Sequence, residues 1–148
     1  MNSLPGIIKK IQQSGAIQLI DLAVDDQAFS AMLLDSATNQ QWMKVDANVS
    51  IIFKETEVSI AKDFRGKISM RNQLQCSIQN IERGELLSII HLQFGKHQIA
   101  SAITTRNVET LGLQINDNVT ALIKSNEISI NNYELQITNY DTIGNSNS

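Results

Sequence analysis

A chain of 148 residues with 42% apolar residues, 18% charged residues and a net charge of −3 has the composition of a soluble globular protein, one domain or two small ones. The negative balance excludes a general attraction to nucleic acid or to anionic membranes, so any anion site must be local. The one cysteine, Cys76, excludes an internal disulfide and fits a reducing compartment, and its strand-like neighbours predict a packed thiol. No export signal and no run of about 20 apolar residues is present. We therefore expect a cytoplasmic protein with no membrane insertion.

The chain repeats itself at a spacing of 70 residues. The stretch "NVSIIFKETEVSI" (48–60) aligns without a gap with "NVTALIKSNEISI" (118–130), and "LPGIIKKIQQSGAIQLIDL" (4–22) aligns with "LQCSIQNIERGELLSIIHL" (74–92). Register is kept over about sixty positions, which indicates a duplicated module rather than chance similarity.

Taken in chain order, each module reads as short strands broken by Gly, Asp and Asn. The expected strands are "IIKKI" (7–11), "AIQLIDLAV" (16–24) and "QAFSAML" (27–33), and in the second copy "CSIQNIE" (76–82), "LLSIIHLQF" (86–94) and "HQIASAIT" (97–104). One stretch per copy has helical spacing, over 36–47 and 104–117; in the second, a Thr could cap the start and Gly112 suits the end.

Roughly five short strands and one brief helix per copy predict a mostly β protein, built of two tandem OB-like Greek-key β-barrel modules, each with one short helix. We place a divergent first module at residues 1–64, a second module at 65–138, and a flexible polar tail at 139–148. The stretch "AKDFRGK" (61–67) reads as a short connector.

The differences between the copies point to a candidate site. Residues 69–71, "SMR", have no complete counterpart, because the first copy begins at the third of these positions. Lys54 aligns with Lys124, but Glu55 stands where the second copy has Ser125. The scaffold is thus kept in both copies, whereas a full set of hydrogen-bond donors is present only in the second.

Such a donor set suits an anion that only accepts hydrogen bonds. Hydroxyls, backbone N–H groups at strand ends and one or two cationic side chains would surround it, and the charged donors would form the stronger bonds. A tetrahedral dianion such as molybdate, tungstate or sulfate fits, while phosphate near neutral pH carries a proton and needs an acceptor. Glu55 in the first copy would repel a dianion. Taken alone, however, an Arg and a Lys at strand ends are more often a solvated rim.

The order of motifs from residue 69 to residue 130 closely resembles the Mop family of molybdate-binding modules, within the TOBE superfamily. That family's pattern opens with Ser-x-Arg-Asn and continues with an Ile-Glu-x-Gly turn, an "xAxIT" strand, a helix ending in Leu-Gly-Leu, and a closing Val-x-Ala-x-Ile-Lys followed by Ser or Ala. The matching segments are Ser69–Asn72, Ile81–Gly84, Ala102–Thr104, Leu111–Leu113 and Val119–Ser125. Residues 4–60 resemble a second, divergent copy.

The resemblance implies a tandem "di-Mop" arrangement of OB-like barrels that bind oxyanions at interfaces between modules, usually between subunits. It implies a homo-oligomer, a dimer, trimer or larger, with no cofactor and with molybdenum present only as the oxyanion. Thr104 would come from a neighbouring module. Carried over by position, the implied oxyanion-binding residues are Ser69, Met70, Arg71, Asn72, Thr104, Lys124 and Ser125.

Other functions find little support in the sequence. His91 and His97 have no Cys or paired carboxylate at ligand spacing, so we expect no metal site. No catalytic pattern is present, so we expect no enzyme, and 5% aromatic residues with a net negative charge argue against single-stranded nucleic acid. Two hypotheses stay open: a cytoplasmic protein for storage or homeostasis of molybdate or tungstate, and an oxyanion-sensing domain of a molybdate transporter ATPase or of a molybdate-responsive transcription regulator.

Overall fold

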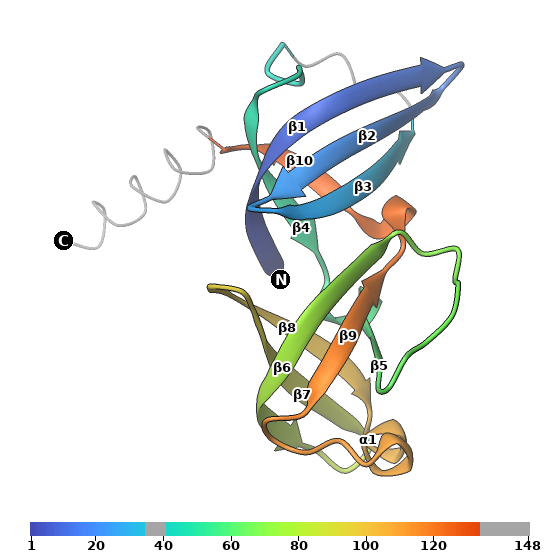
Figure 1. Ribbon diagram of the computed structural model, residues 1–148, viewed down its shortest axis with the longest axis vertical. Coiled ribbons are helices and arrows are strands. Elements are labelled where there is room, and N and C mark those ends of the chain that lie inside the picture. The colour runs from blue at the N-terminus through green and yellow to red at the C-terminus, as the bar shows by residue number, and fades with distance from the viewer. Residues whose placement is uncertain (35–40, 134–148) are drawn as a thin grey trace, which may run out of the picture. The chain divides into compact units, whose positions relative to one another are not determined.

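The computed structural model describes residues 1–34 and 41–133, which are mostly β-strand (Figure 1). The chain divides into two compact units, and each is described by itself. The first-repeat unit contains the described residues of 3–52 and 128–148, and the second-repeat unit contains residues 1–2 and 53–127. The predicted tail, 139–148, lies outside the described residues.

The first-repeat unit holds one five-stranded sheet in the order β10-β4-β1-β2-β3. The pairs β10–β4, β1–β2 and β2–β3 run antiparallel. Its strands are β1 (Asn2–Ser14), β2 (Ile17–Val24), β3 (Gln27–Leu34), β4 (Asn48–Phe53) and β10 (Ser129–Asn132). Of the predicted helix over 36–47, residues 36–40 lie outside the described ranges, and the remaining residues, 41–47, form turns and bends and no helix, so the prediction is wrong over that part.

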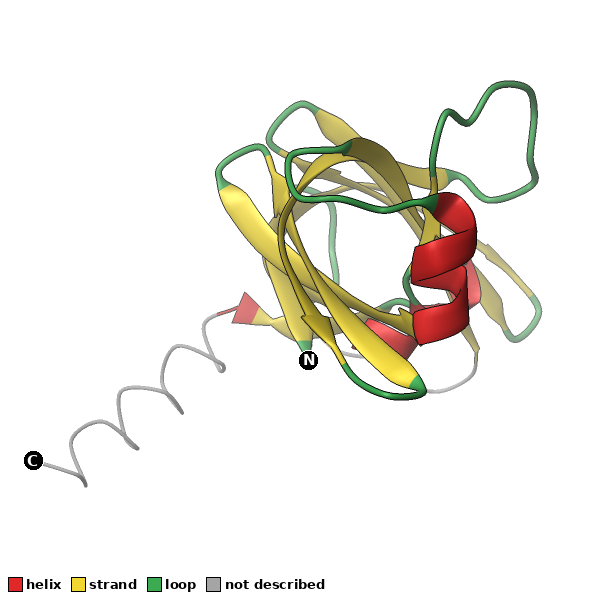
Figure 2. Cartoon of the chain, turned by 90° about the horizontal axis from the view of Figure 1, so that it is seen from below, coloured by secondary structure: helices red, strands yellow, loops and turns green. Residues whose placement is uncertain are grey.

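The second-repeat unit holds the corresponding sheet in the order β5-β9-β6-β7-β8, with α1 following β8 (Figures 1 and 2). Its elements are the 3₁₀ turn η2 (Glu55–Glu57), β5 (Ser59–Ala61), β6 (Asn72–Arg83), β7 (Leu87–Phe94), β8 (His97–Thr104), α1 (Thr105–Leu111), β9 (Asn118–Ile123) and the 3₁₀ turn η3 (Ser125–Glu127).

The two sheets repeat each other residue for residue. In the β1–β2 hairpin Ile11 pairs with Ile20, and in the β6–β7 hairpin Ile81 pairs with Ile90. Both hairpins also contain a register irregularity at the equivalent point. A shared bulge is a specific feature of backbone geometry. The predicted duplication is therefore confirmed in the pairing itself.

The last strand of each repeat pairs within the other unit. β5, from the first repeat, lies against β9, where Ile60 pairs with Ala121. β10, from the second repeat, lies against β4, where Ile130 pairs with Ile51. The compact units therefore do not coincide with the sequence repeats, 1–64 and 65–138. Each unit includes one short strand, β5 or β10, that comes from the other repeat.

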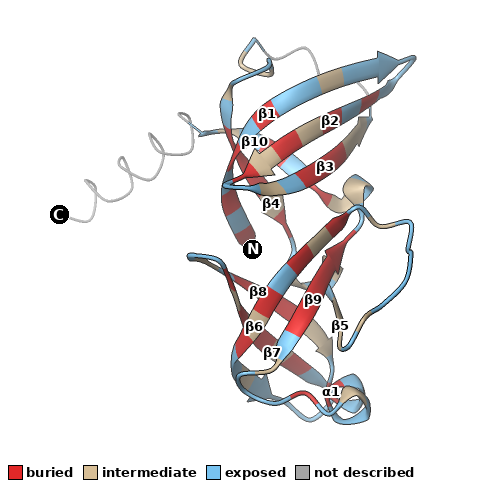
Figure 3. Ribbon diagram, viewed as in Figure 1, coloured by how far each residue is buried: buried red, intermediate tan, exposed pale blue. Residues whose placement is uncertain are grey.

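Alternating burial along the strands builds the core of each unit (Figure 3). β2 and its repeat β7 bury every second side chain, including Ile20 and Leu22 in one copy and Ile90 and Leu92 in the other. This period of two is what a strand produces when one face packs inward. Cys76 is buried in the second-repeat unit, as predicted for a packed thiol.

The single described α-helix has the termini that the sequence predicts. The Thr104 hydroxyl accepts the backbone N–H of Asn107 at 3.3 Å and caps the start of α1. Gly112 ends the helix in the left-handed conformation, at φ 61°, where a side chain would be strained. Thr104 therefore sits at the junction of β8 and α1.

Candidate functional site

The pairing of β6 with β9 brings the two predicted donor clusters together. Asn72, the first residue of β6, pairs with Ile123, the last residue of β9, and its side-chain amide donates to the Ile123 carbonyl at 3.0 Å. Because the two strands are antiparallel, the residues just before β6 and just after β9 lie at the same end of the sheet (Figure 1). Segment 69–71 and segment 124–125 are therefore neighbours.

The side chains at this end of the sheet are accessible, while their backbone is held in place. Ser69, Arg71 and Lys124 are exposed, and Met70 and Ser125 are half-buried. The Lys124 carbonyl accepts the Glu127 N–H at 3.0 Å, which fixes the chain as it enters η3. Two cationic side chains and two hydroxyls are thus presented to solvent from anchored backbone.

Asn72 has a different position from its neighbours, because it is fully buried. Its amide group serves the strand junction, with the bond to Ile123 described above. Asn72 therefore joins the start of β6, which follows segment 69–71, to the end of β9.

Thr104 is not brought to this cluster within its own module. It ends β8, where it pairs with Leu87 at the start of β7. The start of β7 pairs in turn with the end of β6, through Ser88 and Arg83. Thr104 thus lies beside the end of β6 that is remote from Asn72.

The first repeat carries a carboxylate at the equivalent place. Lys54 stands between β4 and η2, as Lys124 stands between β9 and η3. The next residue, Glu55, has a carboxylate oxygen 3.0 Å from the Met1 ammonium. The hydrogen bond from that ammonium, followed by a backbone hydrogen bond, holds the pKa of Glu55 below its ordinary value. The position that corresponds to Ser125 is therefore negatively charged near neutral pH.

Two residues that we did not predict from the sequence, Gln73 and Lys62, hold the segment that leads into β6. The Gln73 amide donates to the Met70 carbonyl at 2.8 Å. The Lys62 ammonium donates to the Gly112 carbonyl at 2.8 Å and to the Asp117 carboxylate at 3.0 Å, which fastens the start of the connector to the turns after α1. These partners lie 50 and 55 residues from Lys62, so no local pattern indicates them.

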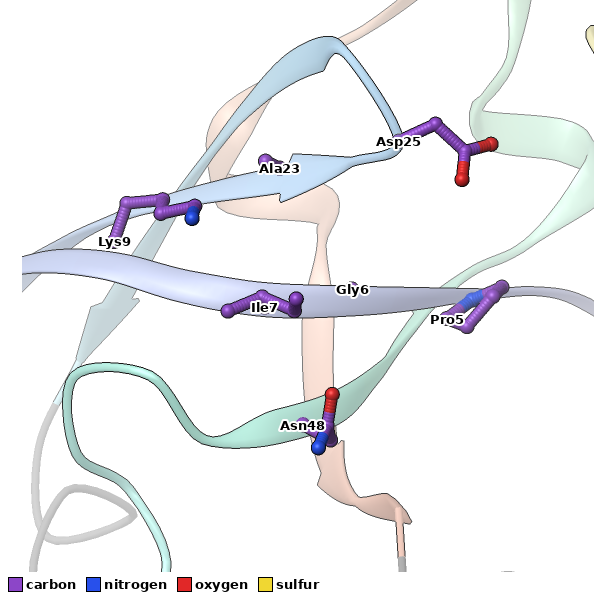
Figure 4. Close-up of a pocket in the computed structure, with 7 residues that line it drawn as sticks. All are labelled: Pro5, Gly6, Ile7, Lys9, Ala23, Asp25 and Asn48. Atoms are coloured by element: carbon purple, nitrogen blue, oxygen red, sulfur yellow. The ribbon is translucent and has the colours of Figure 1, made fainter.

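A surface hollow lies in the first-repeat unit, away from the predicted residues (Figure 4). It measures about 240 Å³ and includes Lys9 and Asp25 among its lining residues, which are Pro5, Gly6, Ile7, Lys9, Ala23, Asp25 and Asn48. The second repeat has Gln93 in place of Ala23, and the Gln93 amide donates across the turn to the Gly95 carbonyl at 2.7 Å.

The histidines and the cysteine have ordinary structural surroundings. His91 Nε2 lies 2.7 Å from a Glu82 carboxylate oxygen on the surface, and the His97 ring lies 6.0 Å from that of Phe94. Burial raises the pKa of the Cys76 thiol to about 12, so it is a poor nucleophile. Within residues 1–34 and 41–133, no three His, Cys, Asp or Glu side chains gather as metal ligands would.

No helix in the described part of the chain has the length and apolar character needed to span a bilayer.

Comparison with known proteins identifies the family. The TOBE domain model matches residues 68–130. The probable molybdenum-pterin-binding protein of Haemophilus influenzae (strain ATCC 51907 / DSM 11121 / KW20 / Rd) is 31% identical over 65 residues, which are 43% of this chain and 94% of that protein. The chain belongs to the Mop/TOBE family. The TOBE match, residues 68–130, includes the motifs between residues 69 and 130 from which we predicted this family.

Two longer likenesses extend over both Mop/TOBE repeats. The molybdenum import ATP-binding protein ModC of Brucella abortus (strain 2308) is 31% identical over 123 residues, 82% of this chain. The chain spans 32% of the length of that protein. The solved structure of the cytoplasmic molybdate-binding protein ModG, with molybdate bound, matches with a TM-score of 0.82 at 20% identity, over 88% of this chain and 94% of that one. The second likeness confirms the predicted tandem fold.

Proposed function

We propose that this protein binds molybdate or tungstate as the intact dianion, for storage or homeostasis of the oxyanion. The proposed site lies at the start of β6 and the end of β9 in the second-repeat unit. Its residues are Ser69, Met70, Arg71, Asn72, Lys124 and Ser125, with Asn72 holding the others in place. The observation that carries the proposal is the Asn72–Ile123 pairing, which sets the two donor clusters side by side.

The chemistry of the cluster supports an anion without a proton. Arg71 and Lys124 supply charged donors, and the hydroxyls of Ser69 and Ser125 can each donate one hydrogen bond. A protonated oxyanion would also need an acceptor from the protein. The cluster thus favours a dianion without a proton over monohydrogen phosphate, which carries one, and we expect sulfate, which is smaller, to bind more weakly than molybdate. We infer no catalytic role and no resident cofactor for these residues.

The two repeats should differ in capacity. The first repeat has the ionised Glu55 in place of Ser125. A carboxylate at this position repels a dianion, at an energetic cost that rises as water is excluded. We therefore propose one complete site for each chain, built on the second repeat.

We also propose that the protein is a homo-oligomer in which Thr104 reaches a site on another module or subunit. Exposed apolar side chains recur beside Thr104 and at the equivalent place in the first repeat. Leu87, which pairs with Thr104, is 51% exposed, and its counterpart Ile17, which pairs with Leu34, is 45% exposed. Apolar surface retained in both repeats is what a self-association surface requires.

A second candidate function rests on the likeness to ModC. This chain spans about a third of that protein, so the same tandem module can form part of a larger machine. In that case oxyanion binding would serve sensing within a transporter ATPase or a transcription regulator. The full length of the natural gene product separates the two: a chain of about 150 residues supports storage, and an additional nucleotide-binding or DNA-binding domain supports sensing. Both assignments place the protein in the cytoplasm.

Isothermal titration with molybdate tests the site directly. Lys124→Ala or Arg71→Ala removes one unit charge next to a dianion. Because these side chains are exposed to water, the loss of binding free energy should be about 2 kcal/mol, or about 30-fold in affinity. Lys54→Ala is the matched control, because Lys54 occupies the repeat-related position beside Glu55. It should change affinity by less than about threefold. Loss of binding in the Lys54 variant alone would move the site to the first repeat.

Native mass spectrometry with and without molybdate tests stoichiometry and assembly together. We expect an oligomer that takes up one molybdate for each chain. A monomer at micromolar concentration would contradict the role of Thr104 in a neighbouring site.

A further inference from the structure

The connector between β5 and β6 carries an excess of positive charge next to the proposed site. Over residues 62–71 it contains Lys62, Arg65, Lys67 and Arg71 against a single carboxylate, Asp63. The connector leads directly into segment 69–71 of the proposed site.

Both ends of this connector are fastened to the second-repeat unit. At its start, Lys62 donates to the Gly112 carbonyl and to Asp117. At its end, the chain enters β6 at Asn72, which donates to Ile123. Between these anchors Gly66 adopts φ 114°, a backbone conformation that suits glycine. The charges in between are thus held near the site by the path of the backbone.

Arg65 and Lys67 lie within electrostatic range of the donor cluster but need not touch the anion. A trans chain spans at most about 3.6 Å per residue, so the Cα atom of Lys67 is within about 7 Å of that of Ser69, and that of Arg65 within about 14 Å. Both side chains are exposed, and in the part of the chain that the structure describes neither forms a salt bridge. Their charges act over a Debye length of about 8 Å at 0.15 M salt and about 30 Å at 0.01 M.

We propose that Arg65 and Lys67 form an outer cationic arm that raises the affinity of the second-repeat site for dianions by long-range attraction. This inference rests on the proposed function and adds two residues to it. Lys62 contributes little to the arm because Asp117 neutralises it. Asp63 and Glu127 oppose the arm, but the two cations of the arm together with Arg71 and Lys124 outnumber these two carboxylates.

The magnitude follows from two unit charges and a dianion about 10 Å apart in water. With screening, Arg65→Gln combined with Lys67→Gln should weaken molybdate binding about sevenfold at 0.01 M ionic strength and about twofold at 0.15 M. The double substitution Arg65→Lys with Lys67→Arg keeps both charges and changes the geometry of both side chains. It should bind as the unaltered protein does, because attraction at this distance depends on charge alone.

Isothermal titration with sodium molybdate at the two ionic strengths tests the arm. The matched control is Lys9→Gln with Lys10→Gln on β1. Like the connector variant, it changes the net charge from −3 to −5. It should change affinity by less than about twofold at 0.01 M. Equal losses in the control and in the connector variant would overturn the arm in favour of a general effect of net charge.

Two other results would overturn the inference. One is an unchanged affinity of the Gln variant at 0.01 M. The other is a loss that persists undiminished at 0.15 M and is not rescued by the charge-conserving variant, which would make these residues direct ligands. Failure of the unaltered protein to bind molybdate at either ionic strength refutes the proposed function itself, so the two failures are distinguishable.

Discussion

Asn72→Ala should destabilise the protein and weaken oxyanion binding together, because Asn72 joins the two halves of the proposed site. Its side chain is fully buried and donates to the Ile123 carbonyl at 3.0 Å. Truncation removes this hydrogen bond and leaves a buried carbonyl oxygen short of a donor, which costs about 1–3 kcal/mol. A loss of about 2 kcal/mol corresponds to a fall of about 4–8 °C in Tm for a chain of this size.

Urea denaturation and calorimetry at pH 7 measure the stability of the variant, and titration with molybdate measures its affinity. We expect a weaker affinity as well, because segment 69–71 loses its attachment to the end of β9. Asn72→Asp conserves the shape but replaces the buried amide donor with a carboxylate that faces the Ile123 carbonyl, so it should lower the Tm further than Asn72→Ala does.

Asn80→Ala is the control for this experiment, because Asn80 is an exposed asparagine on the same strand. It should change the free energy of unfolding by less than about 0.5 kcal/mol. An Asn72→Ala variant as stable as this control would show that the buried amide does not hold the strand junction. Full stability with full affinity would remove Asn72 from the site altogether.

Three further predictions concern the framework of the second-repeat unit. Lys62 lowers the pKa of Asp117, first through the side-chain hydrogen bond, so the stabilising effect of the pair is present above the ordinary aspartate pKa and lost as the pH falls below about 4. The Tm difference between the unaltered protein and Lys62→Ala should therefore disappear in acid. Gly112→Ala should cost about 1 kcal/mol in urea denaturation, because φ is 61° there. Cys76, only 5% exposed, should react with a thiol reagent at pH 8 in denaturant and resist it in the native state, and rapid native labelling would contradict its burial.

Much of the fold follows from signals that the sequence expresses locally. Hydrophobic alternation fixes which face of each strand is buried, and the gapless repeat implies that one hairpin register serves for both copies. The ends of α1 could also be predicted, since a Thr that can accept an N–H and a Gly that tolerates positive φ each have a specific backbone geometry. The residues of the candidate site were predicted from the order of the motifs. The pairing of β6 with β9 explains why all of them except Thr104 lie at one end of the sheet.

Side-chain contacts between residues far apart in the chain could not be predicted from the sequence. Lys62 and Asp117 are 55 residues apart, and nothing in either neighbourhood distinguishes this pair from any other Lys and Asp. The Asn2 amide is another case, since it donates to the Ala100 carbonyl and accepts the Ala100 N–H, both at 2.8 Å. It imitates a peptide group beside β8. Such a contact depends on how the sheet curls, which no pattern of period two specifies.

The exchange of β5 and β10 shows why an internal repeat leaves its own connectivity undecided. In the structure Ile60 pairs with Ala121, and Ile130 pairs with Ile51. Adding the 70-residue spacing to Ile60 gives Ile130, and subtracting it from Ala121 gives Ile51, so β4 and β9 offer matching edges to either terminal strand. Local pairing energies are then nearly equal for a strand that stays with its own repeat and one that crosses. Which strand each terminal strand pairs with then depends on the short segments 54–58 and 124–128. These segments follow β4 and β9 and determine whether the chain can turn back onto its own repeat. An insertion of flexible residues there would relax that constraint, whereas substitutions within the strands would not.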